Sequence, residues 1–236
     1  MNPFDAFFLH LINGLAGRSW TIDGLALALK TNDLFKGGVV TALLWWAWFQ
    51  PGAEQPKRRR AVLVTTAAAF TALLAGRLLA WSLPFRLRPL QNPEAGVNMA
   101  IGLSPMELSS WNSMPSDHAV LFFSLAAGLC FASRALGALA LLHAVFVVCL
   151  PRVYLGLHYP SDILVGAMIG ILIAWTAHSW GRLGRGADVV LGWERRQPAA
   201  FYAGFFLMTA QMSVLFTDLR DIGEWGVEAA QKLLGG

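Results

Sequence analysis

Residues 111–125 read WNSMPSDHAVLFFSL, so a serine, an aspartate and a histidine stand directly before a long apolar run. Hydrophobic residues make up 56% of the 236 positions, and charged residues only 14%, which is well below the roughly 25% of ordinary soluble domains. Several apolar stretches approach or exceed the roughly 17–25 residues that a helix needs to cross a bilayer. The composition therefore predicts an all-α integral membrane protein whose residues 1–236 form a single domain.

Hydropathy and the polar residues between the apolar runs predict about six transmembrane helices in a polytopic bundle. They cover residues 33–50, 61–83, 117–133, 135–151, 160–180 and 199–217. Ahead of them, residues 3–16 place large apolar side chains at helical spacing, with Asp5, His10 and Asn13 off that face. This pattern favours an N-terminal interfacial helix, within a segment 1–32, over a seventh crossing.

Lysine and arginine clusters predict the orientation, because short loops rich in these residues stay in the cytoplasm. One cluster occupies residues 57–60 between the first two spans, and a second lies between the last two spans, at Arg182, Arg185, Arg195 and Arg196. Both loops are expected inside, which places the connections 84–116 and 152–159 on the outer side. Since the basic residues flank the membrane, they indicate contact with the bilayer, and no nucleic-acid partner is expected.

Three polar segments are expected to meet on the outer side, each beside the end of a helix: LPFRLRPL (83–90), MPSDH (114–118) and PRVYLGLHYPSD (151–162). Arg88 and Arg152 carry permanent charge on forked donors that suit phosphate oxygens. Ser116 and the N–H groups that follow it, at a helix N-terminus, would add neutral donors and the positive end of a dipole. The segments therefore predict an anion-binding site with two histidines and an aspartate beside it.

These segments resemble the three motifs of the type 2 phosphatidic acid phosphatase superfamily, whose members share an active site with vanadium haloperoxidases. The family patterns are Lys-x6-Arg-Pro, Pro-Ser-Gly-His and Ser-Arg-x5-His-x3-Asp. They correspond to Arg88-Pro89, to Pro115-Ser116-Asp117-His118, and to Arg152, His158 and Asp162 with both internal spacings kept. The likeness covers roughly residues 33–180, with the core motifs within 81–165. Any one motif alone would be a weak signal, but three in the right order form a strong one.

The resemblance implies a phosphatase in which His158 is the nucleophile and Asp162, four residues later, orients its ring. His118 would protonate the leaving group and then activate water against a phosphohistidine. The substrate's phosphate would be held by the other motif residues, Arg88, Arg152, Ser116 and Asp117. No metal or other cofactor is expected, because the arginines supply the charge that magnesium supplies in other phosphoryl-transfer enzymes.

The sequence departs from the family pattern at three positions. Trp81 stands where the family lysine should fall, and Arg86 is the nearest replacement for that cation, with Arg77 a poorer one. Asp117 replaces the family glycine, and Pro151 replaces the serine before the second arginine. The Pro-Ser-Asp-His variant and the missing lysine resemble bacterial undecaprenyl diphosphate phosphatases of the bacitracin-resistance type.

The resemblance implies hydrolysis of undecaprenyl diphosphate to the monophosphate at the periplasmic face of a bacterial inner membrane. Phosphatidylglycerol phosphate or another lipid phosphate is an alternative substrate, and phosphotransfer to a lipid acceptor would use the same residues. A catalytically silent lipid-binding protein or a transporter is the alternative from another class. The ionisable residues gather at one surface and not at the midplane, which disfavours a transporter. Fixed Arg-to-His and His-to-Asp spacings are not expected of a silent protein.

The loop 90–113 is expected to cover the site, because it lies next to the motifs on the outer side. Its carboxylates, Glu94 and Glu107, would either repel anions or pair with arginines, and the sequence does not decide between these roles. Trp111 and Met114 precede the second motif and are candidates to line the path of a lipid into the site.

The remaining segments carry no motif. Residues 181–198 and the tail 218–236 are polar and amphipathic, and no function is assigned to them. Cys130 and Cys149 are expected to differ in depth by roughly 20 Å at the helical rise of 1.5 Å per residue. Since a disulfide needs Cα atoms within about 7 Å, no disulfide is expected.

Overall fold

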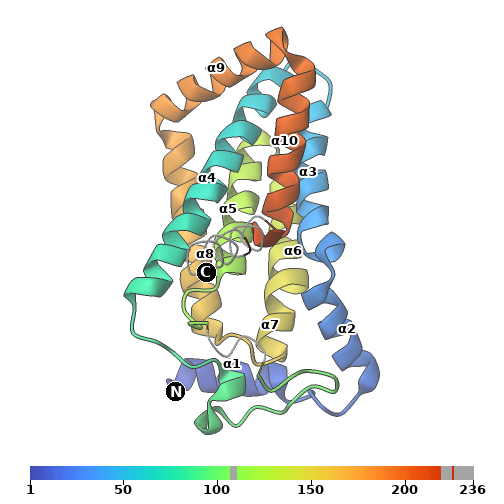
Figure 1. Ribbon diagram of the computed structural model, residues 1–236, viewed down its shortest axis with the longest axis vertical. Helices are drawn as coiled ribbons and strands as arrows, with labels where there is room; N and C mark the ends of the chain where they lie inside the picture. Colours follow the sequence, from blue (N-terminus) through green and yellow to red (C-terminus); the bar gives the residue numbers. More distant parts are fainter. Residues whose placement is uncertain (107–110, 219–224, 226–236) are drawn as a thin grey trace, which may run out of the picture.

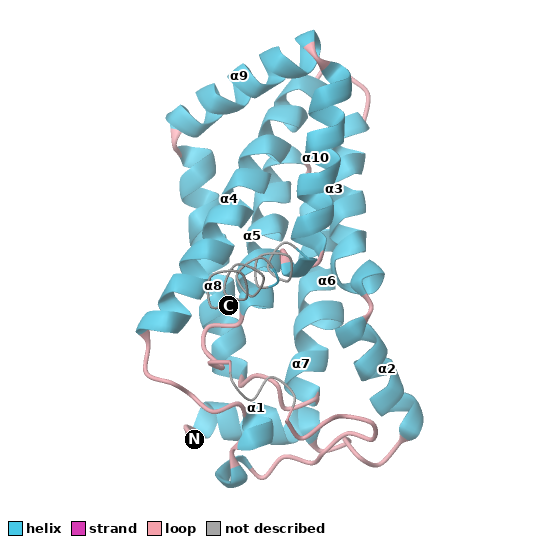
Figure 2. Cartoon of the chain, viewed as in Figure 1, coloured by secondary structure: helices cyan, strands magenta, loops and turns pink. Residues whose placement is uncertain are grey.

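The computed structural model describes residues 1–106, 111–218 and 225. Throughout these residues the regular secondary structure is helical (Figure 2). The α-helices are α1 (Pro3–Asn13), α2 (Trp20–Thr31), α3 (Val39–Phe49), α4 (Gln55–Ser82), α5 (Asp117–Ala132), α6 (Arg134–His143), α7 (Leu150–Tyr154), α8 (Pro160–Ser179), α9 (Gly181–Arg196) and α10 (Pro198–Ser213). Two π-helical segments, η1 (Leu34–Gly38) and η4 (Ala144–Cys149), precede α3 and join α6 to α7.

The predicted membrane bundle is confirmed. Helices α3, α4, α5, α6, α8 and α10 run along the long axis of the molecule (Figure 1), and each of the six expected spans coincides with one of these elements. Among the described residues, three helical stretches are long and apolar enough to cross a membrane: α4, the continuous run Arg134–Tyr154, and α8. Leu34–Phe49 and Asp117–Ala132 are shorter apolar helices.

Helix α5 lies at the centre of the bundle. Ten of its residues between Ala119 and Leu129 are buried, and it packs against α4, α6 and α8. The contact with α8 is close because α8 has glycines where the two helices cross. A Cβ at Gly166 would lie 2.8 Å from the Ser116 carbonyl oxygen, and one at Gly170 would overlap Val120. Small residues are the usual means by which membrane helices approach. This packing places the PSDH segment beside the start of α8.

Helix α1 has the two-sided character expected of an interfacial helix. Four of its large apolar side chains, Phe4, Phe7, Phe8 and Leu11, are exposed, whereas Asp5 and Asn13 are buried together with Leu9. Asn13 donates to the Tyr154 carbonyl (2.7 Å), and Asp5 accepts from the backbone N–H of Ser161 (2.8 Å). The polar face of α1 therefore binds the protein, while its apolar face is left for lipid, and the helix lies across one end of the bundle (Figure 1).

The basic clusters gather at the opposite end, where α4 begins and α9 crosses the bundle (Figure 1). Arg59 pairs with Glu194 (3.2 Å), and Arg60 donates to the Gly184 carbonyl (3.1 Å). Helix α9 thus gives a regular structure to residues 181–196, for which the sequence indicated only an amphipathic segment. Because lysine and arginine favour the cytoplasmic side, this arrangement is consistent with the orientation expected above, in which the α1 end faces outward.

The described part of the connection from α4 to α5, residues 83–106 and 111–116, is irregular and lies against the motif residues. It contains two short 3₁₀ turns, Pro89–Gln91 and Pro93–Ala95, and its Leu90 N–H donates to the Gly156 carbonyl (2.8 Å). Glu94 is exposed, and Glu107 lies outside the described residues, as does most of the tail 218–236. Whether this connection opens and closes over the site stays a prediction. Cys130 and Cys149 are free thiols, as expected.

The close α5–α8 crossing predicts an unusual response to a small substitution. Alanine normally stabilises a helix interior relative to glycine by up to about 1 kcal/mol. Gly170→Ala should instead destabilise the protein by about 1–3 kcal/mol, because the added methyl group overpacks the contact with Val120 and Ser124. The matched control is Gly204→Ala in α10, where a Cβ meets nothing within 4 Å. Thermal unfolding in detergent tests both, and equal effects of the two variants would contradict the prediction.

Candidate active site

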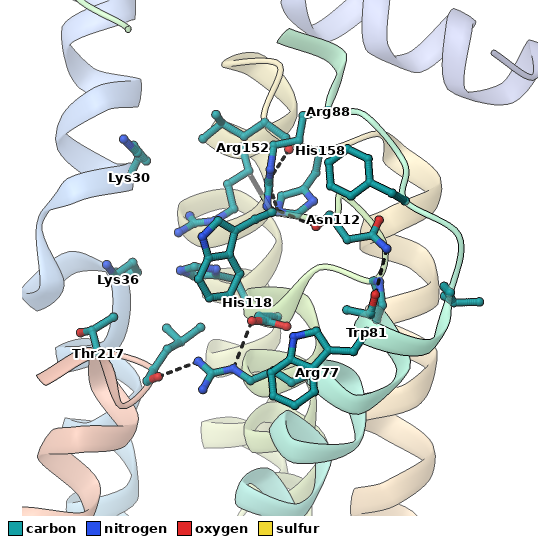
Figure 3. Close-up of a pocket in the computed structure, with 18 of the residues that line it drawn as sticks. Lys30, Lys36, Arg77, Trp81, Arg88, Asn112, His118, Arg152, His158 and Thr217 are labelled. Carbon is teal, nitrogen blue, oxygen red and sulfur yellow. Dashed lines mark hydrogen bonds and ion pairs between the residues drawn. The ribbon is translucent and has the colours of Figure 1, made fainter. Parts of the chain in front are cut away.

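A cavity of about 570 Å³ lies where α2, the end of α4, the start of α5 and the α7–α8 connection meet (Figure 3). Its charged and histidine lining comes from five parts of the chain: Lys30, Lys36, Arg77, Arg88, Asp117, His118, Arg152 and His158. Aromatic side chains, Trp81, Phe85 and Trp111, form part of the wall. The structure therefore brings Arg88, Asp117, His118, Arg152 and His158 together, as the motifs predicted.

The hydrogen bonds of His158 fix which ring nitrogen carries the proton. Nδ1 lies 2.8 Å from the Ser113 carbonyl oxygen, which can only accept, so Nδ1 is protonated and donates. Nε2 lies 3.1 Å from Nη1 of Arg88, which can only donate, so Nε2 keeps its lone pair. Burial lowers the pKa of His158 to about 4, with Asp162 opposing the shift and Arg88 adding to it. The ring is therefore neutral at pH 7, and its unprotonated nitrogen belongs to the cavity wall.

Asp162 lies behind His158 without bonding it directly. Its Oδ2 accepts from the Ser113 hydroxyl (2.6 Å) and from the Tyr159 N–H (2.8 Å), and it is 3.7 Å from Nδ1 of His158, too far for a hydrogen bond. The direct aspartate–histidine bond expected from the spacing is thus replaced by a bond to the Ser113 peptide. Asp162 holds Ser113, and Ser113 holds the histidine.

Two buried guanidinium groups face the same cavity. Arg88 is 5% exposed and Arg152 is 4% exposed, and each donates to a backbone carbonyl, that of Leu157 (2.6 Å) and that of Val148 (2.9 Å) respectively. Their charges are close enough to act on each other. Burying like charges together is costly unless an anion compensates them. The pair therefore indicates an anionic ligand in the cavity.

Ser116 occupies a different place from the one expected. It is fully buried, is absent from the cavity lining, and caps α5 by accepting from the Ala119 N–H (3.5 Å). Its own N–H donates to the Asp162 carbonyl (3.3 Å). In this conformation Ser116 joins the start of α5 to the start of α8, while His118, two residues later, reaches the cavity (Figure 3).

The two candidates for the missing lysine behave differently. Arg86 is absent from the cavity lining and forms ion pairs with Asp5 (2.7 Å) and Asp162 (2.6 Å). Arg77 does line the cavity, where its Nε lies 3.3 Å from the Asp117 carboxylate. Arg86, the nearer candidate in sequence, is thus bound by Asp5 and Asp162 and does not line the cavity. Arg77, the more distant candidate, does line it, and Asp117 partly offsets its charge.

Several contributors carried no recognisable signal in the sequence. Lys30 and Lys36 come from the N-terminal segment, far from any motif, and Ser113 and Asn112 precede the PSDH residues without matching the family pattern. Asn112 accepts from the Arg86 backbone N–H (3.1 Å) and so braces the loop at the cavity wall. Among the described residues, no three His, Cys, Asp or Glu side chains gather closely enough to hold a metal ion.

Comparisons with known proteins agree with this geometry. The model of the PAP2 superfamily matches residues 61–184, more than half of the chain and all three motif segments. BcrC, the bacitracin transport permease protein of Bacillus licheniformis, is 43% identical over 70 residues, which cover 28% of this chain and 34% of that protein. YbjG of Escherichia coli, provisionally named an undecaprenyl-diphosphatase, is 27% identical over 201 residues, 78% of this chain and 94% of YbjG.

The fold also has a counterpart among solved structures. The crystal structure of Aquifex aeolicus LpxE superposes with a TM-score of 0.51 at 23% identity, covering 74% of this chain and 94% of that one. At that identity the likeness concerns the fold, and it agrees with the helical bundle described above. Together with the family match across the motif residues, it leads to one assignment: the chain belongs to the PAP2 superfamily.

Proposed function

We propose that this PAP2 protein hydrolyses undecaprenyl diphosphate to the monophosphate at the periplasmic face of a bacterial inner membrane, without a metal ion. The observation that carries the proposal is the state of His158: a neutral ring with its unprotonated Nε2 beside the buried guanidinium of Arg88. This arrangement provides a nucleophile and a phosphate-binding group in one cavity. The similarity to YbjG, provisionally named an undecaprenyl-diphosphatase, supports the choice of lipid.

In the first step, Arg88 and Arg152 hold the terminal phosphoryl group, and Nε2 of His158 attacks its phosphorus. A nitrogen–phosphorus bond forms as the bond to the bridging oxygen breaks. His118 donates its proton to that oxygen, so the lipid monophosphate leaves. The Ser113 carbonyl, held by Asp162, accepts the Nδ1 hydrogen bond of the ring as it becomes positive.

In the second step, water attacks the phosphorus of the phosphohistidine. His118, now unprotonated, takes a proton from the water, and the nitrogen–phosphorus bond breaks to release inorganic phosphate. His118 regains the proton that it gave away, and His158 returns to its neutral state. The two guanidinium groups stabilise the phosphoryl oxygens in both steps, which explains how the reaction proceeds without magnesium.

The supporting residues have positions that fit this scheme. We propose that Ser116 and Asp117 act mainly by organising the start of α5: Ser116 as its cap and Asp117 as the partner of Arg77. Arg86 positions Asp162 and couples it to Asp5 of α1, and it does not bind phosphate. Trp81, Phe85 and Trp111 line the cavity, and this aromatic wall suits the tail of a lipid.

The first prediction concerns the nucleophile. His158→Ala should lower phosphate release from undecaprenyl diphosphate by about 10³-fold or more, since no other group replaces the attacking nitrogen. The assay uses detergent-purified protein with a chelator present, and His10→Ala, an exposed histidine, serves as the control. Release only from phosphatidylglycerol phosphate would keep the mechanism and change the substrate. Histidine-independent release, or none, would contradict the proposal and favour phosphotransfer or a silent protein.

The second prediction concerns the protonation of His158. Because burial lowers its pKa to about 4, the free ring should stay neutral from pH 7 down to about pH 4 and gain a proton only below that. ¹⁵N NMR of histidine-labelled protein should show one ring protonated at Nδ1 and not at Nε2, with no titration near pH 6.5. Its signals are identified by their absence from His158→Ala. Titration near pH 6.5, or the opposite tautomer, would contradict the geometry.

The third prediction separates positioning from phosphate binding at Arg86. If Arg86 positions Asp162, Arg86→Ala should lower kcat by about 10–100-fold, the loss typical of residues that orient a functional side chain, while KM changes little. Removal of a group that binds the substrate's phosphate should raise KM instead. Arg86→Lys should recover part of kcat by restoring a cation near Asp5 and Asp162. Arg59→Ala, which breaks an ion pair with Glu194 at the other end of the bundle, is the control.

A further inference from the structure

Two lysines on the cavity wall have no counterpart in the three motifs. Lys30 comes from the end of α2 and Lys36 from η1, and Figure 3 shows both on the N-terminal segment, across the cavity from Arg88 and His158. They precede residues 61–184, the part that matches the family model. The N-terminal segment therefore adds two cations to a site whose arginines and histidines come from elsewhere.

Lys36 is held toward the side of the cavity where His118 lies. Its ammonium group lies 2.7 Å from Asp33, and its side chain is only 14% exposed, whereas that of Asp33 is 52% exposed. Asp33 does not line the cavity, but Lys36 does. The charge of Lys36 also acts on His118, together with those of Arg152 and Arg88. Lys36 and His118, the proposed proton donor, thus lie on the same side of the cavity (Figure 3).

We propose that Lys36, assisted by Lys30, binds the second phosphate of a diphosphate substrate, the one that remains on the lipid. This inference rests on the proposed function, in which Arg88 and Arg152 hold the phosphoryl group that is transferred. The bridging oxygen faces His118, so the phosphate beyond that oxygen extends toward Lys36. A compact ammonium group suits this task, because it can follow a phosphate whose orientation changes as it departs.

The subsite would stabilise the leaving group of the reaction. When a diphosphate is cleaved, negative charge builds up on the phosphate that leaves with the lipid, and a nearby cation stabilises that charge more in the transition state than in the bound substrate. A lipid monophosphate has only carbon at this place. The two lysines would therefore make the site selective for diphosphates, without contributing to the capture of a single phosphate by the arginines.

Binding measurements test the subsite independently of turnover. The probes are methylenediphosphonate, which carries two linked phosphorus groups and resists cleavage, and inorganic phosphate, each titrated calorimetrically into detergent-purified protein. Lys36→Gln should weaken methylenediphosphonate about 10-fold or more, the loss expected for one charge-assisted contact. Binding of inorganic phosphate should change by less than about 3-fold. Lys30→Gln should also weaken methylenediphosphonate more than inorganic phosphate, but by a smaller factor than Lys36→Gln.

Two further variants distinguish binding from a structural role. Lys57→Gln is the matched control, because Lys57 also pairs with a carboxylate three residues earlier (Glu54, 2.9 Å) but lies in the first turn of α4, at the other end of the bundle. Asp33→Asn removes the partner of Lys36 and should keep or strengthen methylenediphosphonate binding. If Asp33→Asn instead weakened it as much as Lys36→Gln does, the ion pair would be structural and the inference would be wrong.

The remaining outcomes are equally decisive. Equal weakening of both probes would mean that Lys36 replaces the missing family lysine at the transferred phosphate, which overturns the second-phosphate assignment. Unchanged binding in Lys36→Gln, or no binding of methylenediphosphonate to the unaltered protein, also overturns it. Selective weakening in a protein that releases no phosphate from lipids would support the subsite and reject the proposed hydrolysis. Phosphate release from the lipid diphosphate, together with equal weakening of both probes in Lys36→Gln, would support the hydrolysis and reject the subsite.

Discussion

The close approach of α5 and α8 is the constraint on which the site depends. Glycines at positions 166 and 170 let the backbone of α8 reach that of α5, and the Ser116 N–H then bonds the Asp162 carbonyl. Since His118 is the second residue of α5 and His158 precedes α8, this one contact sets the distance between the two histidines. A wider crossing would leave both residues present in the sequence and too far apart to line the same cavity.

Asp162 links the α5–α8 contact to His158 and to α1 through a chain of short polar contacts. It binds Ser113 on one side and Arg86 on the other, and Arg86 continues to Asp5 in the interfacial helix. Asp5 also accepts from the Ser161 hydroxyl (2.7 Å), which closes the network. The orientation of the proposed nucleophile is therefore linked to how α1 is bound, and α1 presents its aromatic face to the membrane surface.

The sequence predicted those features that depend on local pattern. Hydropathy located the helices because a bilayer imposes their length, and the fixed spacing from Arg152 to His158 to Asp162 located one wall of the site. It did not show that Arg86 would pair with Asp5, because that contact joins residues 81 positions apart. Lys30 and Lys36 were not predicted for the same reason. The expected phosphate contact of Ser116 stays a prediction, since in the structure its hydroxyl caps α5. Helix α2 is too polar for hydropathy to reveal.

The balance of charge around the cavity bears on which lipid the proposed reaction uses. Among the described residues, five cationic side chains and one carboxylate line the cavity, and the carboxylate, Asp117, pairs with Arg77. The arginines at positions 88 and 152 suffice for one phosphoryl group, and a second phosphate would meet Lys36, whose partner Asp33 has a side chain that is 52% exposed. A diphosphate supplies charge to both sides. After cleavage the charge is divided between two separate products, each of which meets only part of the cationic wall, so both are held less firmly than the substrate was.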